Sequence, residues 1–295
     1  MSIAISGTAR AARRPRSRSG LVRFTREQPL GAIALFLITL FVVVAVLAPW
    51  IAPYDPLAQD RVNILTAPGV GGHLAGTDEL GRDVLSRSLY GARTSLLIAV
   101  ATLALGGAIG LIVGVVSGYF GGTWIDSVLQ RIMDALMAIP SIVLLLFVAA
   151  LLGPSVRNTV IALSLLVIPS INRVARGEML RIREEPYVEA ARSVGCGTPR
   201  ILLRYGLPNL MAPLFVMGSL LFAVILIAES ALSFLGIGTP PPTPSWGRML
   251  SEGRSQLEIA PWMTVVPGLI LSVSVLAFNL LGDAMRDFLD PKQRR

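Results

Sequence analysis

The polar residues whose types and spacing could do chemistry gather in one segment, Glu189 to Asn209, which reads EAARSVGCGTPRILLRYGLPN. The segment lies between two long apolar runs. A loop that only joined two such runs could be short and without features, but this one carries signals for two short helices in succession. It predicts a helix–turn–helix knob held outside a membrane, with the chemistry of a contact surface rather than of a catalyst.

The signals for the two short helices are prolines and glycines at defined places. Pro186 favours the first turn of a helix, where the missing N–H of proline leaves no hydrogen bond unmade. Gly195 and Gly197 can end that helix in a left-handed conformation. In the pair 198–199, the threonine is a candidate N-cap and the proline a candidate first-turn residue of the second helix. We expect Pro208 to end that second helix.

The residue types that catalysis and metal binding most often use are scarce. Cys196 is the only cysteine, so an intrachain disulfide is excluded. His73 is the only histidine, so a histidine cluster for a metal is excluded. Lys292 is the only lysine, and Gln293 follows it, whereas a phosphate-binding P-loop needs Gly-Lys-Ser/Thr. We therefore expect no catalytic residue, no metal and no cofactor, and any ATP hydrolysis must come from separate subunits.

The composition is that of a membrane protein. Hydrophobic residues make up 53% of the chain, charged residues only 15%, and the mean hydropathy is +0.68. Several apolar runs reach the roughly 20 residues that cross about 30 Å of hydrocarbon. We predict an all-α integral membrane protein with six spans, the first an uncleaved anchor helix. The predicted spans are Leu30–Trp50, Thr94–Tyr119, Ser127–Leu152, Val156–Ala175, Leu210–Ser233 and Met263–Asp283.

The distribution of basic residues predicts the orientation. With the N-terminus inside, 19 of the 26 Lys and Arg residues fall on cytoplasmic segments and 7 on external ones. Since cytoplasmic loops are enriched in Lys and Arg, we expect both termini and the 189–209 segment in the cytoplasm of a cell-membrane protein. The net charge of +8 follows from this asymmetry and does not indicate nucleic-acid binding.

A few residues within the predicted spans have their own interpretation. Glu229, near the outer end of the fifth span, either faces a translocation pathway or outer gate, or is satisfied by neighbouring helices. Pro140 and Pro169 would kink or break their helices and so shape a central cavity. Glycines at four-residue spacing in the second span favour close helix packing. These are Gly106, Gly110, Gly114 and Gly118.

The spacing in the knob resembles the cytoplasmic EAA motif of ATP-binding-cassette (ABC) importer permeases. That motif is Glu-Ala-Ala, three residues, Gly, nine residues, Ile, one residue and Leu-Pro. The matching positions are Glu189, Ala190, Ala191, Gly195, Leu207 and Pro208. Tyr205 stands at the isoleucine position and is a departure from the pattern.

The resemblance implies a type I ABC importer transmembrane fold and a set of partners. The partners would be a homologous second permease subunit, two ABC ATPase subunits, an external solute-binding protein and the lipid bilayer. Ala190 and Ala191 would enter a groove on the ATPase, Glu189 would make a polar contact at its rim, and Gly195 would permit the sharp turn. The implied domains are a basic cytoplasmic tail (1–29), a first helix with an external segment (30–93), a five-helix core (94–283) with a coupling loop at about 177–208, and a cytoplasmic C-terminal tail (284–295).

Three further stretches resemble the dipeptide, oligopeptide and nickel branch of these permeases. They are GTDELGRDVLSR and TPPPTPSW in the two long external segments, the second predicted to form an ordered cap, and AFNLLGDAMRDFLDP at the C-terminus. The resemblance implies import of peptides or a related small solute by alternating access, with nickel or glutathione as alternatives. An ion-coupled secondary carrier and a non-transporting scaffold are the competing classes. A carrier would need functional acids or bases near the midplane and inverted repeats.

Overall fold

The computed structural model describes residues 24, 25 and 27–289. Within this part of the chain the fold is helical, and the only β-type pairs are two isolated bridges in the segment 70–83. The helices are α2 (Pro29–Ile51), α3 (Val84–Tyr119), α4 (Trp124–Ala138), α5 (Ser141–Leu152), α6 (Val156–Arg183), α7 (Pro186–Ser193), α8 (Thr198–Ile201), α9 (Leu207–Phe234), α10 (Trp246–Gly253) and α11 (Trp262–Leu289).

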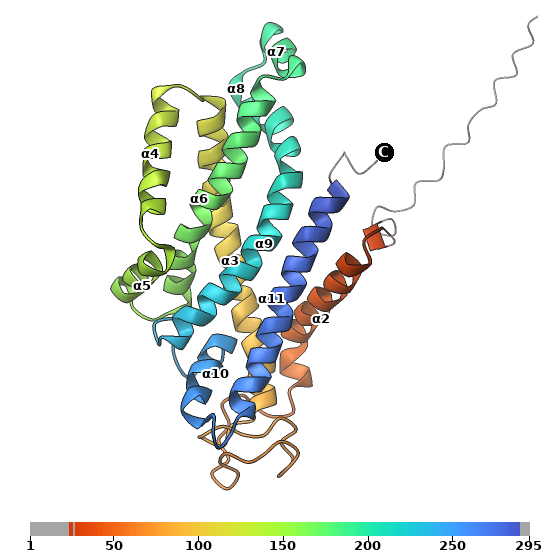
Figure 1. Cartoon of the computed structure of the whole chain (residues 1–295), viewed down its shortest axis with the longest axis vertical. Coiled ribbons are helices and arrows are strands. Elements are labelled where there is room, and N and C mark those ends of the chain that lie inside the picture. The colour runs from red at the N-terminus through yellow and green to blue at the C-terminus, as the bar shows by residue number, and fades with distance from the viewer. Residues whose placement is uncertain (1–23, 26, 290–295) are drawn as a thin grey trace, which may run out of the picture.

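Five helical stretches are long and apolar enough to cross a membrane, and α4 with α5 makes a sixth span if the bent pair is counted as one. The predicted third span is therefore not one straight helix, because α4 and α5 meet at 91°. Pro140 is the reason, since it follows the extended residue Ile139 and cannot continue a helix. Figure 1 shows α4 and α5 at one side of the bundle and α2 at the other.

Three spans are longer than the sequence predicted. Helix α3 begins ten residues before Thr94, where Asp83 caps it by accepting a 2.7 Å hydrogen bond from the Ser86 N–H. Helices α6 and α11 run past their predicted ends to Arg183 and Leu289. Charged residues end a membrane span but not a helix, because they project into water without disturbing the backbone. Pro169 lies inside the unbroken α6.

The glycine stripe of α3 packs against α6, as predicted. A Cβ at Gly110 would lie 2.6 Å from the carbonyl oxygen of Ile168, and one at Gly114 would lie 2.7 Å from that of Asn172. Gly106 and Gly118 meet α6 equally closely. The two backbones can approach this closely only because four glycines share one face. The α3–α6 pair is therefore the rigid centre of the bundle.

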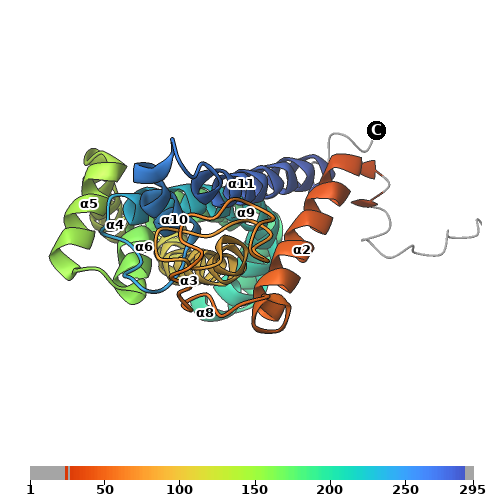
Figure 2. The same ribbon diagram turned by 90° about the horizontal axis from the view of Figure 1, so that it is seen from below.

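The two long segments 52–83 and 235–261 form an ordered cap at the end of the bundle opposite α7. Glu252 of α10 accepts hydrogen bonds from Arg87 at 2.7 Å and from Arg82 at 3.1 Å, which joins the two segments. Trp246 is fully buried and donates its indole N–H to the Ser88 carbonyl at 3.1 Å. Seen from below, α10 and the 52–83 segment lie together over the end of the bundle (Figure 2).

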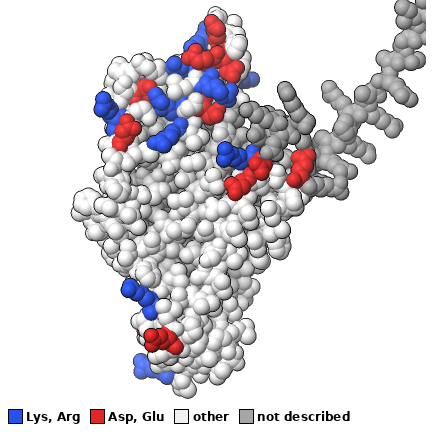
Figure 3. All heavy atoms as spheres, in the orientation of Figure 1, with Lys and Arg blue, Asp and Glu red and all other residues white. Residues whose placement is uncertain are grey.

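The predicted basic tail, 1–29, falls almost wholly outside the described residues, as does 290–295 of the predicted C-terminal tail. Among the described residues, charged side chains gather at the α7 end of the molecule and, more sparsely, at the cap end (Figure 3). The belt between them is almost free of charge on the face shown. An apolar belt between two charged ends is what a bilayer-spanning bundle requires.

Candidate functional site: the knob between α6 and α9

The first short helix of the knob ends in a Schellman motif. Helix α7 has Pro186 in its first turn and is followed by Gly195 at φ +82°. The Cys196 N–H donates to the Ala191 carbonyl at 3.0 Å, and the Gly195 N–H donates to the Arg192 carbonyl at 2.9 Å. The predicted left-handed role of Gly195 is confirmed, and the chain reverses there.

The second short helix begins one residue earlier than predicted. Helix α8 starts at Thr198 with Gly197 as its N-cap, and Pro199 lies in its first turn. Gly197 has φ −69° and ψ 154°, so the prediction of a left-handed conformation at this residue is wrong. A single left-handed residue at 195 already completes the reversal, and an N-cap residue takes extended geometry.

Pro208 does not end the second helix, which corrects the sequence-based expectation. The chain passes from α8 through one π-helical turn, Leu202–Gly206, directly into α9. The Leu207 N–H donates to the Leu202 carbonyl in the wider i→i+5 pattern of a π-helix. Pro208 then occupies the first turn of α9, where its missing N–H is tolerated. The Asn209 side chain donates to the Tyr205 carbonyl at 2.7 Å.

The knob is anchored to the membrane helices by its own small apolar core. Its buried members are Met179, Ile182, Val188, Ile201 and Leu210. They come from α6, α7, α8 and α9, so both short helices pack against two membrane spans. Arg192 lies 5.2 Å from the ring centroid of Tyr119 at the end of α3, which adds a third attachment.

The two alanines of the motif lie in different environments. Ala191 is only 6% exposed and lies three residues after the buried Val188, on the same face of α7. The expectation that Ala191 enters a partner's groove stays a prediction, and in this structure little of its side chain is open to such a contact. Glu189 and Ala190 are exposed. The nearby Tyr187, Val194 and Leu203 are exposed too, and 79% of Val194 is open to solvent. Outward contacts are available to these residues, and Ala191 serves the packing beneath them.

The remaining positions of the motif also belong to the knob. Leu207 is half-buried and Pro208 exposed at the start of α9. Tyr205, the departure from the pattern, packs against the knob core, and its ring centroid lies 6.1 Å from that of Tyr187. The larger side chain is accommodated because it spans the gap between the π-helical turn and α7.

A polar cluster beside the knob escaped the sequence analysis. Asp126 of α4 accepts two hydrogen bonds from Arg176 of α6, both at 2.8 Å, and a third from Ser117 of α3. Gln130 donates to Ser117 at 2.7 Å. The cluster ties α4 to the α3–α6 pair. The carboxylate and the guanidinium are 50 residues apart in the sequence, so no local spacing could reveal them.

Glu229 is fully buried among hydroxyl groups rather than open to a cavity. It accepts hydrogen bonds from Ser233 at 2.8 Å, Ser95 at 3.3 Å and Thr239 at 3.4 Å. These groups come from α9, α3 and the cap, so the geometry is that of a satisfied carboxylate joining three segments. Trp246 donates its backbone N–H to Ser95 at 3.3 Å. A role of Glu229 at the pathway or outer gate stays a prediction.

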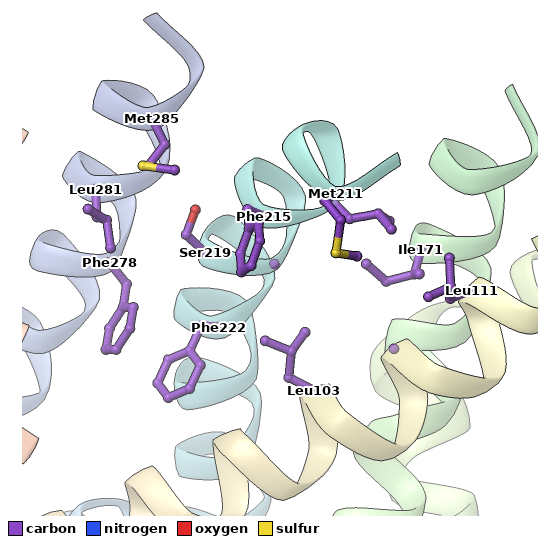
Figure 4. A pocket seen from close by; sticks show the side chains of 13 residues that line it. Leu103, Leu111, Ile171, Met211, Phe215, Ser219, Phe222, Phe278, Leu281 and Met285 are labelled. Atoms are coloured by element: carbon purple, nitrogen blue, oxygen red, sulfur yellow. The ribbon is translucent and has the colours of Figure 1, made fainter. Parts of the chain in front are cut away.

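A cavity of about 420 Å³ lies between α3, α6, α9 and α11. Leu103, Met211, Phe215 and Met285 are among the side chains that surround it (Figure 4). The lining is apolar apart from the hydroxyl of Ser219. Stacked rings of Phe222 and Phe278, with centroids 4.0 Å apart, lie at the cavity.

Within the described residues no group of three or more His, Cys, Asp or Glu side chains could hold a metal ion. Comparison with protein families gives two matches. The family described as the binding-protein-dependent transport system inner membrane component matches residues 106–295. The N-terminal TM domain of oligopeptide transport permease C matches residues 21–68.

Curated relatives cover most of the chain. The di/tripeptide transport system permease protein DppC of Pseudomonas aeruginosa is 43% identical over 268 residues, which is 89% of this chain and 88% of the relative. The glutathione transport system permease protein GsiD of Escherichia coli is 43% identical over 271 residues, which is 92% of this chain and 88% of the relative.

A solved structure shares the fold. Inward-facing MetNI, a methionine ABC transporter, matches with a TM-score of 0.56 at 18% identity, covering 70% of this chain and 98% of that chain. The structural match therefore supports the predicted transmembrane fold of ABC importers.

Proposed function

Because the chain belongs to the family of binding-protein-dependent transport system inner membrane components, and is thus a permease subunit of an ABC importer, we propose that it moves short peptides across the cell membrane. The observation that carries the substrate class is the 43% identity to a di/tripeptide permease over 89% of the chain. The chain has no P-loop, so the ATPase activity resides in other subunits.

The knob is the proposed coupling element. When two ATPase subunits close on ATP, the exposed face around Glu189 and Ala190 follows them. The buried core beneath Ala191 passes that movement to α6 and α9. Gly195 and the motif pair 207–208 fix the two ends of the knob. The membrane helices then tilt and the cavity changes the side to which it opens, which is alternating access.

We also propose the orientation and the assembly. The knob and both termini face the cytoplasm, in keeping with the enrichment of Arg near α7. The cap faces the external binding protein. One copy pairs with a homologous second permease and two ATPase subunits. The five-helix core 94–283, with its coupling loop at 177–208, forms the translocating unit.

Uptake of a radiolabelled dipeptide tests the function. Cells that lack their own peptide importers are given the complete operon, with or without this chain. We expect uptake only with the complete set, and loss of uptake when the ATPase subunits carry a hydrolysis-deficient substitution. Uptake that continues without this chain would refute the proposal.

Glutathione is a second candidate substrate, since a glutathione permease of Escherichia coli shows the same 43% identity. Competition separates the two. If an excess of unlabelled glutathione suppresses dipeptide uptake, both solutes use the same transport route. If the cells take up glutathione but no dipeptide, glutathione is the substrate. Nickel added as a chelate is tested in the same assay.

A further inference from the structure

We propose that the break between α4 and α5 forms one wall of a water-filled chamber at mid-membrane, and that the main chain of the transported peptide passes through this chamber. The inference rests on the proposed peptide substrate. It assigns the place of passage and the chemistry of contact, which are hydrogen bonds to backbone groups rather than to selective side chains.

The first wall consists of two helix ends that face a gap. Helix α4 stops at Ala138 and α5 starts at Ser141, so the last carbonyls of α4 have no following turn to bond them. On the other side of the break, the N–H groups of Val143 and Leu144 donate back to the Pro140 carbonyl at 2.9 and 3.0 Å. The N–H groups of Ser141 and Ile142 precede this first turn and have no partner within the helix.

The second wall is the middle of α6. Pro169 is the fourteenth of the 28 residues of this helix and lies within the membrane span predicted over 156–175. Proline has no N–H to donate to the carbonyl four residues earlier, that of Leu165. The adjacent Ser170 hydroxyl bonds weakly to the Leu166 carbonyl, at 3.4 Å. Both walls therefore present backbone groups that ordinary helices would have paired.

A cavity of about 390 Å³ lies between the two walls, and Val224 of α9 contributes to it. Its lining includes Pro140, Ser141, Pro169 and Ser170. The volume is within the roughly 300–1,000 Å³ of small-molecule sites. Unpaired backbone groups at membrane depth persist only where protein or water satisfies them, and in the proposed chamber water fills this role. Broken helices at the midplane supply substrate contacts in other transporters for the same reason.

The chemistry of the chamber fits a peptide whose side chains vary. Peptide main chain presents N–H and C=O groups in alternation, so it can replace water at the carbonyls of α4 and α6 and at the N–H groups of α5. No charged side chain lines the cavity. The larger cavity of about 420 Å³ offers no comparable break, since its lining residues lie on continuous helices.

Thiol labelling tests the chamber in the assembled transporter. Cys196 is the only cysteine, so Cys196→Ser gives a cysteine-free background. Ser141→Cys and Ser170→Cys place thiols in the chamber, and Ser272→Cys, on the exposed face of α11, is the matched control. A membrane-impermeant thiosulfonate reacts with ionised thiols in water. We expect roughly tenfold faster labelling at 141 and 170 than at 272.

The substrate provides the second measurement. Excess tripeptide during turnover should slow labelling at positions 141 and 170 and leave position 272 unchanged. Ser170→Trp, which fills the chamber, should reduce uptake at least about tenfold, with membrane abundance and ATPase co-purification unchanged; Ser272→Trp should keep normal uptake.

Three results would overturn the inference. They are equal labelling at all three positions with and without ATP, fast labelling without protection by peptide, and normal uptake by Ser170→Trp. The proposed function fails in a different way, because a wild-type transporter that imports no peptide would refute the substrate while leaving the labelling ratio intact.

Discussion

Gly195 offers the sharpest test of the coupling knob, because the structure separates backbone strain from steric contact at this residue. Its φ is +82°, and a Cβ at this position would meet no atom within 4 Å. A side chain therefore has room, and only the left-handed backbone conformation opposes it. Gly197 is the matched control, since its φ of −69° suits any residue and its Cβ would meet only the Pro199 ring at 3.9 Å.

The expected magnitudes follow from that geometry. Gly195→Ala should cost about 1–2 kcal/mol, the penalty of a left-handed conformation for a residue with a Cβ. This corresponds to a shift of about 5- to 30-fold between the ordered and the frayed knob. Gly195→Asn should cost less, because asparagine tolerates this conformation. Gly195→Pro should cost most, because it fixes φ near −65° and removes the hydrogen bond to the Arg192 carbonyl. Gly197→Ala should cost less than Gly195→Ala, because it weakens only the N-cap of the four-residue α8 and needs no left-handed backbone.

The assay compares peptide uptake, ATPase co-purification and membrane abundance for the four variants. We expect uptake and co-purification to fall in the order Gly197→Ala, Gly195→Asn, Gly195→Ala, Gly195→Pro. Membrane abundance should hold, because insertion depends on the apolar spans. Normal uptake by Gly195→Pro, or a larger loss in Gly197→Ala than in Gly195→Ala, would refute the assignment of the knob as the coupling element.

Three further predictions concern the membrane bundle. Gly110→Ala should lower the thermal stability of the purified transporter, because a Cβ at Gly110 lies 2.6 Å from the Ile168 carbonyl. Gly107→Ala should leave it unchanged, because a Cβ there meets nothing within 4 Å. Equal melting temperatures for the two variants would contradict the α3–α6 packing. Glu229→Leu should destabilise the protein by about 2–3 kcal/mol, since it leaves buried hydroxyls without an acceptor, and Glu229→Gln should retain most of the stability. Limited proteolysis in membranes measures this difference. Equal resistance of the two variants to the protease would count against the prediction. Cysteines at Ser193 and Thr243 should react with an impermeant reagent from opposite sides of the membrane, and reaction from one side only would exclude the proposed orientation.

Much of the fold could be predicted from local sequence. Hydrophobic length is a local property, so the runs around α2 and α9 located these spans to within a few residues. The left-handed role of Gly195 was also predictable, because a glycine after a short polar helix has few other uses. The motif at 189–208 indicated where the knob lies, since its spacing is read along one continuous stretch of chain.

Other features depended on which surfaces meet. Ala191 and Ala190 are adjacent and identical, and only the position of α6 beneath α7 decides that the first is buried and the second exposed. Pro208 resembles a helix stop in the sequence, yet a π-helical turn makes room for it at the start of α9.

The sequence by itself determined the membrane class, the number of apolar runs, the knob and the absence of a P-loop, because each is encoded in a contiguous stretch or in composition. The tertiary structure alone decided that Asp126 bonds Arg176, that Glu229 is enclosed by hydroxyls from three segments, and that the break at Pro140 faces Pro169 across a cavity. These pairs are far apart along the chain, and their interactions fall off within a few ångströms, so they exist only once the helices have packed.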